Sequence, residues 1–377
     1  MKLGILRETS DDRRVAMLPD SILASKKVFD VDYLVERGAG QESFISDEAY
    51  QQIDAQITDR ENIFADADII LSIADPQIEE LKRMSGGQVL LSVFQPMTNK
   101  HYVNELRKQH ITAFSLDIIP RITRAQSMDV LSSQATAAGY KAVLEAAVRL
   151  PEFFPMLMTA AGTIKPAKVL VLGAGVAGLQ AVATARRLGA VVRVFDVRSA
   201  VKEEVESLGA VFIEVEGAKD DADAGGYAVE QSDDFKQRQM ALIQDYVAKS
   251  NVVIATAQIP GKKSPLLIKK HTLGLMKPGS VVVDLAASSG GNCELTENNK
   301  VLNHQGVTII GKSDFPSTIP VSSSLMFGKN VVNFLKLLMD KNNQLQLNFD
   351  DEIIRETCVT HQGKLVSERI KNIYSNH

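Results

Sequence analysis

Short apolar runs alternate with amphipathic segments along the first third of the chain. Five runs have the length and composition of buried strands, at residues 2–8, 31–36, 67–73, 88–93 and 111–116. Between them, apolar positions three and four residues apart predict helices, for example over residues 99–108. Because strands that alternate with helices are typical of a parallel sheet, this pattern predicts an α/β domain.

The pattern changes near residue 132, where the run ATAAGYKAVLEAAVRL predicts a long helix leading into a second domain. Beyond it, six predicted strands form a second parallel sheet, at residues 169–173, 191–195, 210–215, 251–256, 280–284 and 307–310. The later run VSSSLMFGKNVVNFLKLLMD predicts an amphipathic helix that returns the chain to the first domain. We therefore expect two Rossmann-like α/β domains. A doubly wound domain of residues 133–321 is inserted in a discontinuous first domain of residues 1–132 and 322–377.

Composition narrows the classes of function. With 377 residues the chain is too long for one ordinary core, and 45% hydrophobic with 23% charged residues is typical of a folded globular protein. A net charge of -4 argues against a nucleic-acid-binding face, which needs a basic patch. No apolar run reaches the ~18 residues of a membrane span, and the start lacks the apolar core of a signal peptide. Two cysteines without metal-ligand spacing predict a reducing cytoplasm and no metal site.

A glycine fingerprint opens the second domain, in AKVLVLGAGVAGLQAVATARRLGAVVRVFDVRS. The apolar strand ends at Gly173, Gly175 and Gly178 follow, and Asp196 ends the next strand about 20 residues on. The glycines permit a tight turn, close approach of a pyrophosphate and close packing of helix on strand. Asp196 suits an unphosphorylated ribose, which predicts NAD(H), although the nearby Arg198 is a residue type that accepts a 2'-phosphate. A glycine turn in a sheet that binds no ligand remains the structural alternative.

Several motifs together resemble one family. They are RAQSMD (124–129), GAGVAGL (173–179), FDVR (195–198), IPGK (259–262), VDLA through GGNCE (283–294) and NVVNFLKLL (330–338). In order and spacing they are similar to the NAD(H)-binding components of proton-translocating nicotinamide nucleotide transhydrogenases, over nearly the whole chain. The chain stops at IKNIYSNH where many relatives continue into membrane helices, so it resembles the split form of that enzyme.

The resemblance implies partners and a location. It implies a membrane-spanning component and an NADP(H)-binding component on separate chains, and a homodimer of this chain. The expected location is the cytoplasm, peripheral on the inner face of the cytoplasmic membrane. Hydride then passes between NAD(H) here and NADP(H) on the partner, coupled to proton movement through the membrane component.

The resemblance also assigns roles in the run PRITRAQSMDVLSSQ. It implies that Arg121, Gln126, Asp129 and Ser132 belong to a loop that fixes the nicotinamide, with Asp129 and Ser132 suited to the carboxamide. Gln126 is expected to face the partner's NADP(H). The alternative is that Arg121 and Asp129 only cap the following helix, since an acid in the first turn favours the helix dipole.

The remaining implied cofactor contacts are spread over both domains. An acidic, glycine-containing segment at residues 216–234 corresponds to a mobile loop of the family that closes over nucleotide; a solvated surface loop is the alternative. Gln258 stands where relatives usually have a leucine. The full expected set is Ser127, Ser132, Gly173, Gly175, Val176, Gly178, Asp196, Val197, Arg198, Gly226, Tyr227, Gln239 and Gln258.

Alanine dehydrogenases share the fold and several motifs, and are the main alternative. Oxidation of an amino acid releases protons as well as hydride, so that site needs an acid/base. Ala74 stands where that family has a lysine, LLSVFQP lacks its histidine, and Ser288 replaces its aspartate. Arg14 matches its carboxylate-binding arginine, but without these companions a structural role is favoured.

Transfer between two nicotinamides moves no substrate proton, so positioning groups suffice. This chemistry fits the absence of an acid/base. A third hypothesis, a non-catalytic NAD-binding module that regulates a partner, keeps the cofactor residues but has no need for the segment 121–132.

Overall fold

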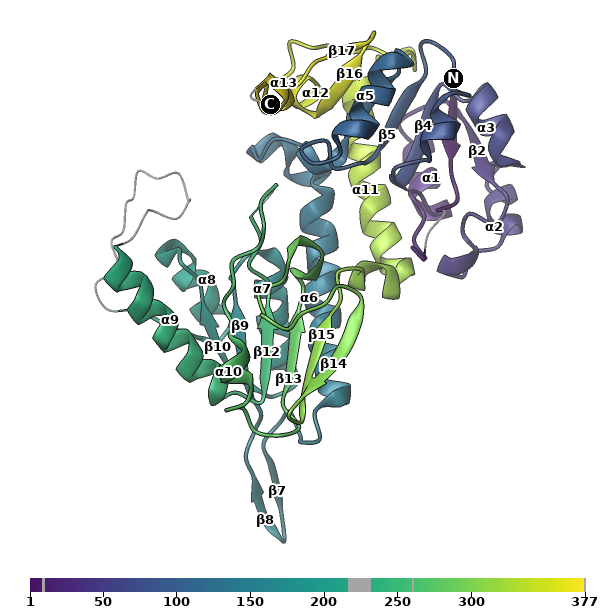
Figure 1. Ribbon diagram of the computed structural model, residues 1–377. Coiled ribbons are helices and arrows are strands. Elements are labelled where there is room, and N and C mark those ends of the chain that lie inside the picture. Colours follow the sequence, from purple (N-terminus) through teal and green to yellow (C-terminus); the bar gives the residue numbers. More distant parts are fainter. Residues whose placement is uncertain (9–10, 216–231, 260, 376–377) are drawn as a thin grey trace. The chain divides into compact units, whose positions relative to one another are not determined.

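The computed structural model describes residues 1–377 apart from 9–10, 216–231, 260 and 376–377. The chain forms two compact units (Figure 1). Unit 1 comprises Met1–Gln134 and Pro316–His377, and unit 2 comprises Ala135–Phe315. Helix α6 (Val130–Arg149) carries the chain from the first unit into the second. The sequence placed these boundaries after residues 132 and 321.

Unit 1 contains an eight-stranded sheet in the order β17-β16-β6-β5-β4-β1-β2-β3. The six strands from β6 to β3 are parallel, and β16 and β17 each pair antiparallel. The central strands are almost fully buried, as expected for a sheet covered on both faces. The strands are β1 (Lys2–Ile5), β2 (Asp32–Glu36), β3 (Gln56–Thr58), β4 (Ile69–Ala74), β5 (Val89–Val93), β6 (Thr112–Ser115), β16 (Cys358–His361) and β17 (Lys364–Leu365).

The helices of unit 1 cover both faces of this sheet. One core includes residues of α1 (Pro19–Lys26), α2 (Asp47–Gln51), α11 (Pro320–Leu338) and α12 (Glu352–Thr357). The other includes residues of α3 (Arg60–Asp66), α4 (Ile78–Leu81), α5 (Lys100–Lys108) and α13 (Glu368–Ser375). Alternation along β1 explains the division: Leu3 and Ile5 enter the first core, while Gly4 lies under α3, where a Cβ atom would come within 2.3 Å of Ile63.

Unit 2 contains a seven-stranded sheet in the order β11-β10-β9-β12-β13-β15-β14. Six strands are parallel, and β14 pairs antiparallel with β15 at the edge. The order reverses between β9 and β12, which makes their carboxyl ends the switch point of a doubly wound sheet. The strands are β9 (Lys168–Leu172), β10 (Val191–Phe195), β11 (Val211–Phe212), β12 (Val252–Ala255), β13 (Val281–Asp284), β14 (Lys300–His304) and β15 (Val307–Gly311).

Helices again lie on both faces of the sheet of unit 2. The core on one face includes residues of α6, α7 (Val176–Arg187) and α8 (Lys202–Ser207), and the core on the other includes residues of α9 (Asp233–Ala248) and α10 (Lys270–Leu273). A separate hairpin of β7 (Leu157–Thr159) and β8 (Gly162–Ile164) projects from this unit (Figure 1). None of the helices in the described residues is long and apolar enough to cross a membrane.

The predicted fold class, two Rossmann-like α/β sheets, is confirmed. The prediction of six parallel strands in the second sheet is incomplete, because antiparallel β14 adds a seventh. In the first sheet the short strands β3, β16 and β17 were not predicted, nor was the hairpin β7–β8. These strands lie at sheet edges or outside the main sheets, where exposed residues weaken the apolar signal.

Candidate functional site

The glycine turn of unit 2 follows strand β9 at the switch point. Gly173 has φ of 103°, a value that favours glycine, and its N–H donates to the Phe195 carbonyl at 2.8 Å. The Thr256 hydroxyl lies 3.1 Å from the Gly173 carbonyl oxygen and 3.2 Å from that of Leu172. A Cβ atom on Gly173 would lie 2.6 Å from the Thr256 Oγ1 atom. The turn is therefore held by the neighbouring strand β12 and has no room for a side chain.

The other two fingerprint glycines meet opposite surroundings. A Cβ atom on Gly178 would come within 1.9 Å of the Gly173 carbonyl oxygen, so only glycine lets α7 pack this close to the turn. Gly175 precedes the first residue of α7, and a Cβ atom there would have no protein atom within 4 Å. The space beside Gly175 is thus open where the N–H groups of a helix N-terminus favour an anion.

Asp196 follows β10 and is nearly buried, with a side chain 7% exposed. Its carboxylate accepts from the N–H of Ala174 at 2.7 Å, inside the glycine turn. It also accepts from Nε and Nη2 of Arg198, both at 3.0 Å. These hydrogen bonds and the charge of Asp196 raise the pKa of Arg198 above its ordinary value. Asp196 therefore joins the turn to a fixed cation, and any ribose hydroxyl at this carboxylate meets Arg198 as well.

The other expected contacts in unit 2 have varied positions. Val176 and Val197 are 42% and 56% exposed, beside the glycine turn and Asp196. Gln239 lies half-buried on α9. Gln258 follows β12, and its amide nitrogen donates to the Leu285 carbonyl at 3.0 Å, which ties two strand ends together. Gly226 and Tyr227 lie outside the described residues.

In unit 1 the segment 120–129 is a fixed structure. It forms a 3-10 helix, Thr123–Met128, in which Ala125 and Met128 enter the core. Arg124 makes a bidentate ion pair with Asp351, at 2.6 and 2.7 Å. The Ser127 carbonyl accepts from the side chains of Asn330 and Asn333 on α11, at 2.8 and 3.2 Å. One of the two arginines in the motif is thus structural, and the segment is anchored to α11 and α12.

The predicted nicotinamide residues lie on both sides of this anchor. Arg121, Gln126 and Ser127 are exposed. Asp129 accepts from the Ser132 N–H at 2.9 Å and from the Ser132 hydroxyl at 2.6 Å, at the start of α6. Asp129 therefore caps α6, as the capping alternative describes, and in doing so holds Ser132 beside its carboxylate.

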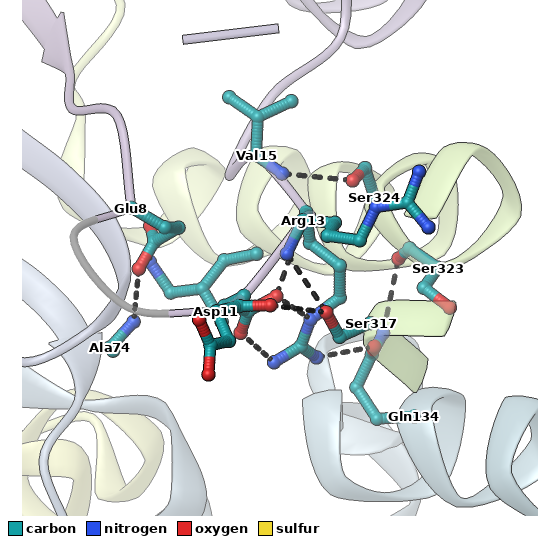
Figure 2. A network of polar contacts seen from close by, with 12 residues as sticks. Glu8, Asp11, Arg13, Val15, Ala74, Gln134, Ser317, Ser323 and Ser324 are labelled. Atoms are coloured by element: carbon teal, nitrogen blue, oxygen red, sulfur yellow. Dashed lines mark hydrogen bonds and ion pairs between the residues drawn. The ribbon is translucent and has the colours of Figure 1, made fainter. Parts of the chain in front are cut away.

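A second polar cluster of unit 1 surrounds Arg14 (Figure 2). Arg14 Nε and Nη2 donate to the two carboxylate oxygens of Asp12 at 2.9 and 2.6 Å, and Nη1 donates to Gln134 Oε1 at 2.7 Å. Burial acts to raise the pKa of Asp12, but the hydrogen bonds and charge of Arg14 outweigh it and hold the pKa below its usual value. Only 15% and 14% of the Arg14 and Asp12 side chains are exposed. The chain's own Asp12 therefore fills the carboxylate-binding face of Arg14.

Glu8 lies between strands β1 and β4 at the switch point of the first sheet. Its carboxylate accepts from the N–H groups of Ile73 and Ala74 at 2.7 and 3.0 Å (Figure 2). Burial raises the pKa of Glu8 to about 7, against the lowering effect of these two hydrogen bonds. Near neutral pH this side chain is therefore a buried acid that titrates.

Glu8→Gln is expected to flatten the dependence of stability on pH. The raised pKa means that the folded state binds the Glu8 proton more tightly than the unfolded state, so this group's contribution falls as pH rises from 4.5 through about 7. At about 1.4 kcal/mol per pKa unit the loss is about 3 kcal/mol. Urea unfolding at pH 5 and pH 8 measures it in both proteins. An unchanged slope in the variant would contradict the raised pKa.

The sequence analysis missed several residues that build these sites. Thr256, Gln134 and Asp12 were not singled out, although each makes hydrogen bonds that fix a predicted residue. Arg14 and Gln134 are 120 positions apart, and no local pattern joins them. For Asp12 the adjacent DDRR run was the only available signal.

Comparison with known proteins follows the same division of the chain. The N-terminal domain model of the alanine dehydrogenase/PNT family matches residues 4–138, and its C-terminal domain model matches residues 142–368. The first portion of the split NAD(P) transhydrogenase subunit alpha of Rhodospirillum rubrum is 42% identical over 378 residues, covering 97% of this chain and 98% of that protein.

Solved structures and more distant relatives agree. The crystal structure of a transhydrogenase from Sinorhizobium meliloti has a TM-score of 0.88 and 42% identity, covering 97% of this chain and all of that one (100%). Alanine dehydrogenase of Mycolicibacterium smegmatis is 26% identical, covering 98% of this chain and 96% of that protein. The chain therefore belongs to the alanine dehydrogenase/PNT family, and within it is more similar to these transhydrogenases than to that alanine dehydrogenase.

Proposed function

We propose that this chain is the NAD(H)-binding component of a proton-translocating NAD(P) transhydrogenase. In this function, hydride passes between NAD(H) on this chain and NADP(H) on a partner component, and the transfer is coupled to proton movement through a membrane component. Similarity to transhydrogenase alpha subunits over nearly the whole chain supports this proposal.

The residues present in unit 2 fit an NAD(H) molecule. The turn is closed to side chains at Gly173 and Gly178 but open beside Gly175, where a pyrophosphate needs access to backbone. Asp196 stands where the acid of the dinucleotide fingerprint meets the ribose hydroxyls. Gly173, Gly175 and Asp196 would hold the cofactor, with Val176, Val197 and Arg198 beside them.

The observation that carries the choice of reaction is the Asp12–Arg14 pair. An amino-acid dehydrogenase needs a cation for the carboxylate of its substrate, and here the bidentate face of Arg14 is engaged by Asp12. Ala74 and Ser288 stand where a lysine and an aspartate are expected in such an enzyme. Without these groups the chain suits a transfer in which no substrate proton moves.

The segment 121–132 supplies positioning groups for that transfer. When bound, NADH supplies the hydride and NADP⁺ accepts it. Asp129 and Ser132 hold each other at the start of α6 and present a carboxylate and a hydroxyl suited to a carboxamide. Arg121 and Gln126 are exposed on a segment whose backbone is anchored, so a partner component has access to them. Gln126 then orients the NADP(H) of that partner.

Partners follow from the same proposal. The name of the relative from R. rubrum describes one portion of an alpha subunit, which makes that relative a component of an assembly. We extend this to an NADP(H)-binding component and a membrane-spanning component on other chains, with this chain peripheral on the inner face of the cytoplasmic membrane. The exposed apolar side chains of the hairpin, including Met158 at 78% and Met156 at 56%, support a homodimer.

Hydride transfer in a reconstituted system tests the proposal. The purified chain is mixed with the NADP(H)-binding component of a transhydrogenase, and transfer between NADH and an NADP⁺ analogue is followed by absorbance. Transfer that depends on both proteins is expected. NADH binding without any transfer would favour a regulatory module, and oxidation of alanine by NAD⁺ would favour the dehydrogenase.

NADH is expected to bind at least about tenfold more tightly than NADPH, which corresponds to about 1.4 kcal/mol. The nearly buried carboxylate of Asp196 repels a 2'-phosphate, although Arg198 offsets part of its charge. Arg198→Ala should therefore widen the gap, because the variant keeps the acid and loses the cation. Calorimetry with both nucleotides measures this, and equal affinities in the wild type would refute the NAD(H) assignment.

A further inference from the structure

The start of α6 is tied to the rest of unit 1 through one side chain. Both ends of the Gln134 amide are engaged: Oε1 accepts from Arg14 at 2.7 Å, and Nε2 donates to the Ser323 carbonyl of α11 at 3.1 Å. Gln134 is two residues beyond Ser132, so at 3.6 residues per turn the two side chains point about 200° apart around the helix. Gln134 therefore holds α6 from the side opposite Ser132.

Arg14 is itself fixed in place. Its fork to Asp12 uses two of its nitrogens, and the backbone on either side is anchored at the start of α11. The Arg13 N–H donates to Ser317 Oγ at 2.8 Å, and the Val15 N–H donates to Ser324 Oγ at 2.9 Å (Figure 2). A hydrogen bond from a rigidly held guanidinium fixes its acceptor in direction as well as distance.

We propose that Asp12, Arg14 and Gln134 form a positioning device that sets the orientation of Asp129 and Ser132 for hydride transfer. This inference rests on the proposed function, since it assigns these residues to the same reaction. They act through the first turns of α6 and contact neither Asp129 nor Ser132 in the hydrogen bonds of the described structure. A small rotation of α6 would move the Ser132 hydroxyl, and misplacement of about 1 Å can cost 10²-fold in rate.

The chain offers a matched control for this network. Arg60 on α3 makes ion pairs with Glu36 and Glu80, at 2.8 and 2.5 Å, and its side chain is 18% exposed against 15% for Arg14. Arg60 contacts the opposite end of the sheet order, near β2, and does not hydrogen-bond to α6. A lysine at either position keeps the charge and loses the planar fork.

The experiment compares Arg14→Lys with Arg60→Lys in the reconstituted transfer assay, with NADH affinity and a melting curve for each. Arg14→Lys is expected to slow transfer about tenfold or more, with NADH affinity within about twofold of wild type. Arg60→Lys should lose comparable stability and transfer at the wild-type rate. In the Ser132→Ala background the effect of Arg14→Lys should largely disappear, because both changes act on one group.

Each other outcome has a definite meaning. Equal rates for Arg14→Lys and wild type, or equal slowing by Arg14→Lys and Arg60→Lys, would overturn the positioning role. Additive effects of Arg14→Lys and Ser132→Ala would do the same. Absence of transfer in the wild type would refute the proposed function and this inference with it, so the two failures are distinguished by the wild-type rate.

Discussion

Gly175→Ala is expected to weaken NADH binding by about 10²-fold or more while the protein stays folded. The new methyl group meets no protein atom within 4 Å, and the φ of -78° at this position suits any L-residue. The free energy of unfolding should therefore change by less than about 1 kcal/mol. The methyl group instead occupies the space through which a pyrophosphate reaches the N–H groups of α7.

Gly178→Ala is the contrasting variant. Its methyl group would come within 1.9 Å of the Gly173 carbonyl oxygen, so α7 must shift away from the turn. Overpacking of this kind costs about 1–3 kcal/mol, and NADH binding should fall as well. Calorimetry with NADH and thermal melting of both variants separate the two effects. Wild-type affinity in Gly175→Ala would show that the open space beside this glycine is not a pyrophosphate site.

The sequence predicted the centre of each sheet well because central parallel strands are continuous apolar runs. Strand β10 lies at residues 191–195, as predicted, with a mostly buried pattern. Edge strands lack that signal: β14 pairs at one side only and is largely exposed, and β17 has two residues. Pairing with β15 and β16 creates these strands, and that information is not local.

The candidate site divides in the same way. The glycine turn could be predicted because its residues are close in sequence and each has a distinct steric reason. The role of Arg124 could not, since its partner Asp351 is 227 positions away. The resemblance named Asp129 and Ser132, whereas their mutual hydrogen bond, which also caps α6, is visible only in the structure. Gly226, Tyr227 and the nicotinamide roles stay predictions.

Gln126→Ala is expected to slow hydride transfer by about 10²-fold or more with NADH affinity nearly unchanged. Gln126 is exposed on a segment whose backbone is held by other residues: Arg124 pairs with Asp351, and the Ser127 carbonyl accepts from Asn330. Removing its amide should therefore leave the segment in place. If that amide orients the partner's NADP(H), binding of NADH and the rate of transfer will separate.

Gln52→Ala is a suitable control, because it removes another exposed glutamine of the same unit after helix α2. The β2 strand that precedes α2 is separated from β6, which precedes the segment of Gln126, by β5, β4 and β1. Gln52→Ala should transfer hydride at the wild-type rate. Stopped-flow transfer with the NADP(H)-binding component, beside a melting curve, measures both variants. A capping or core role for Gln126 predicts loss of thermal stability with transfer reduced only in proportion to folded protein. Wild-type transfer by a stably folded Gln126→Ala would leave the exposed amide without a role in the reaction.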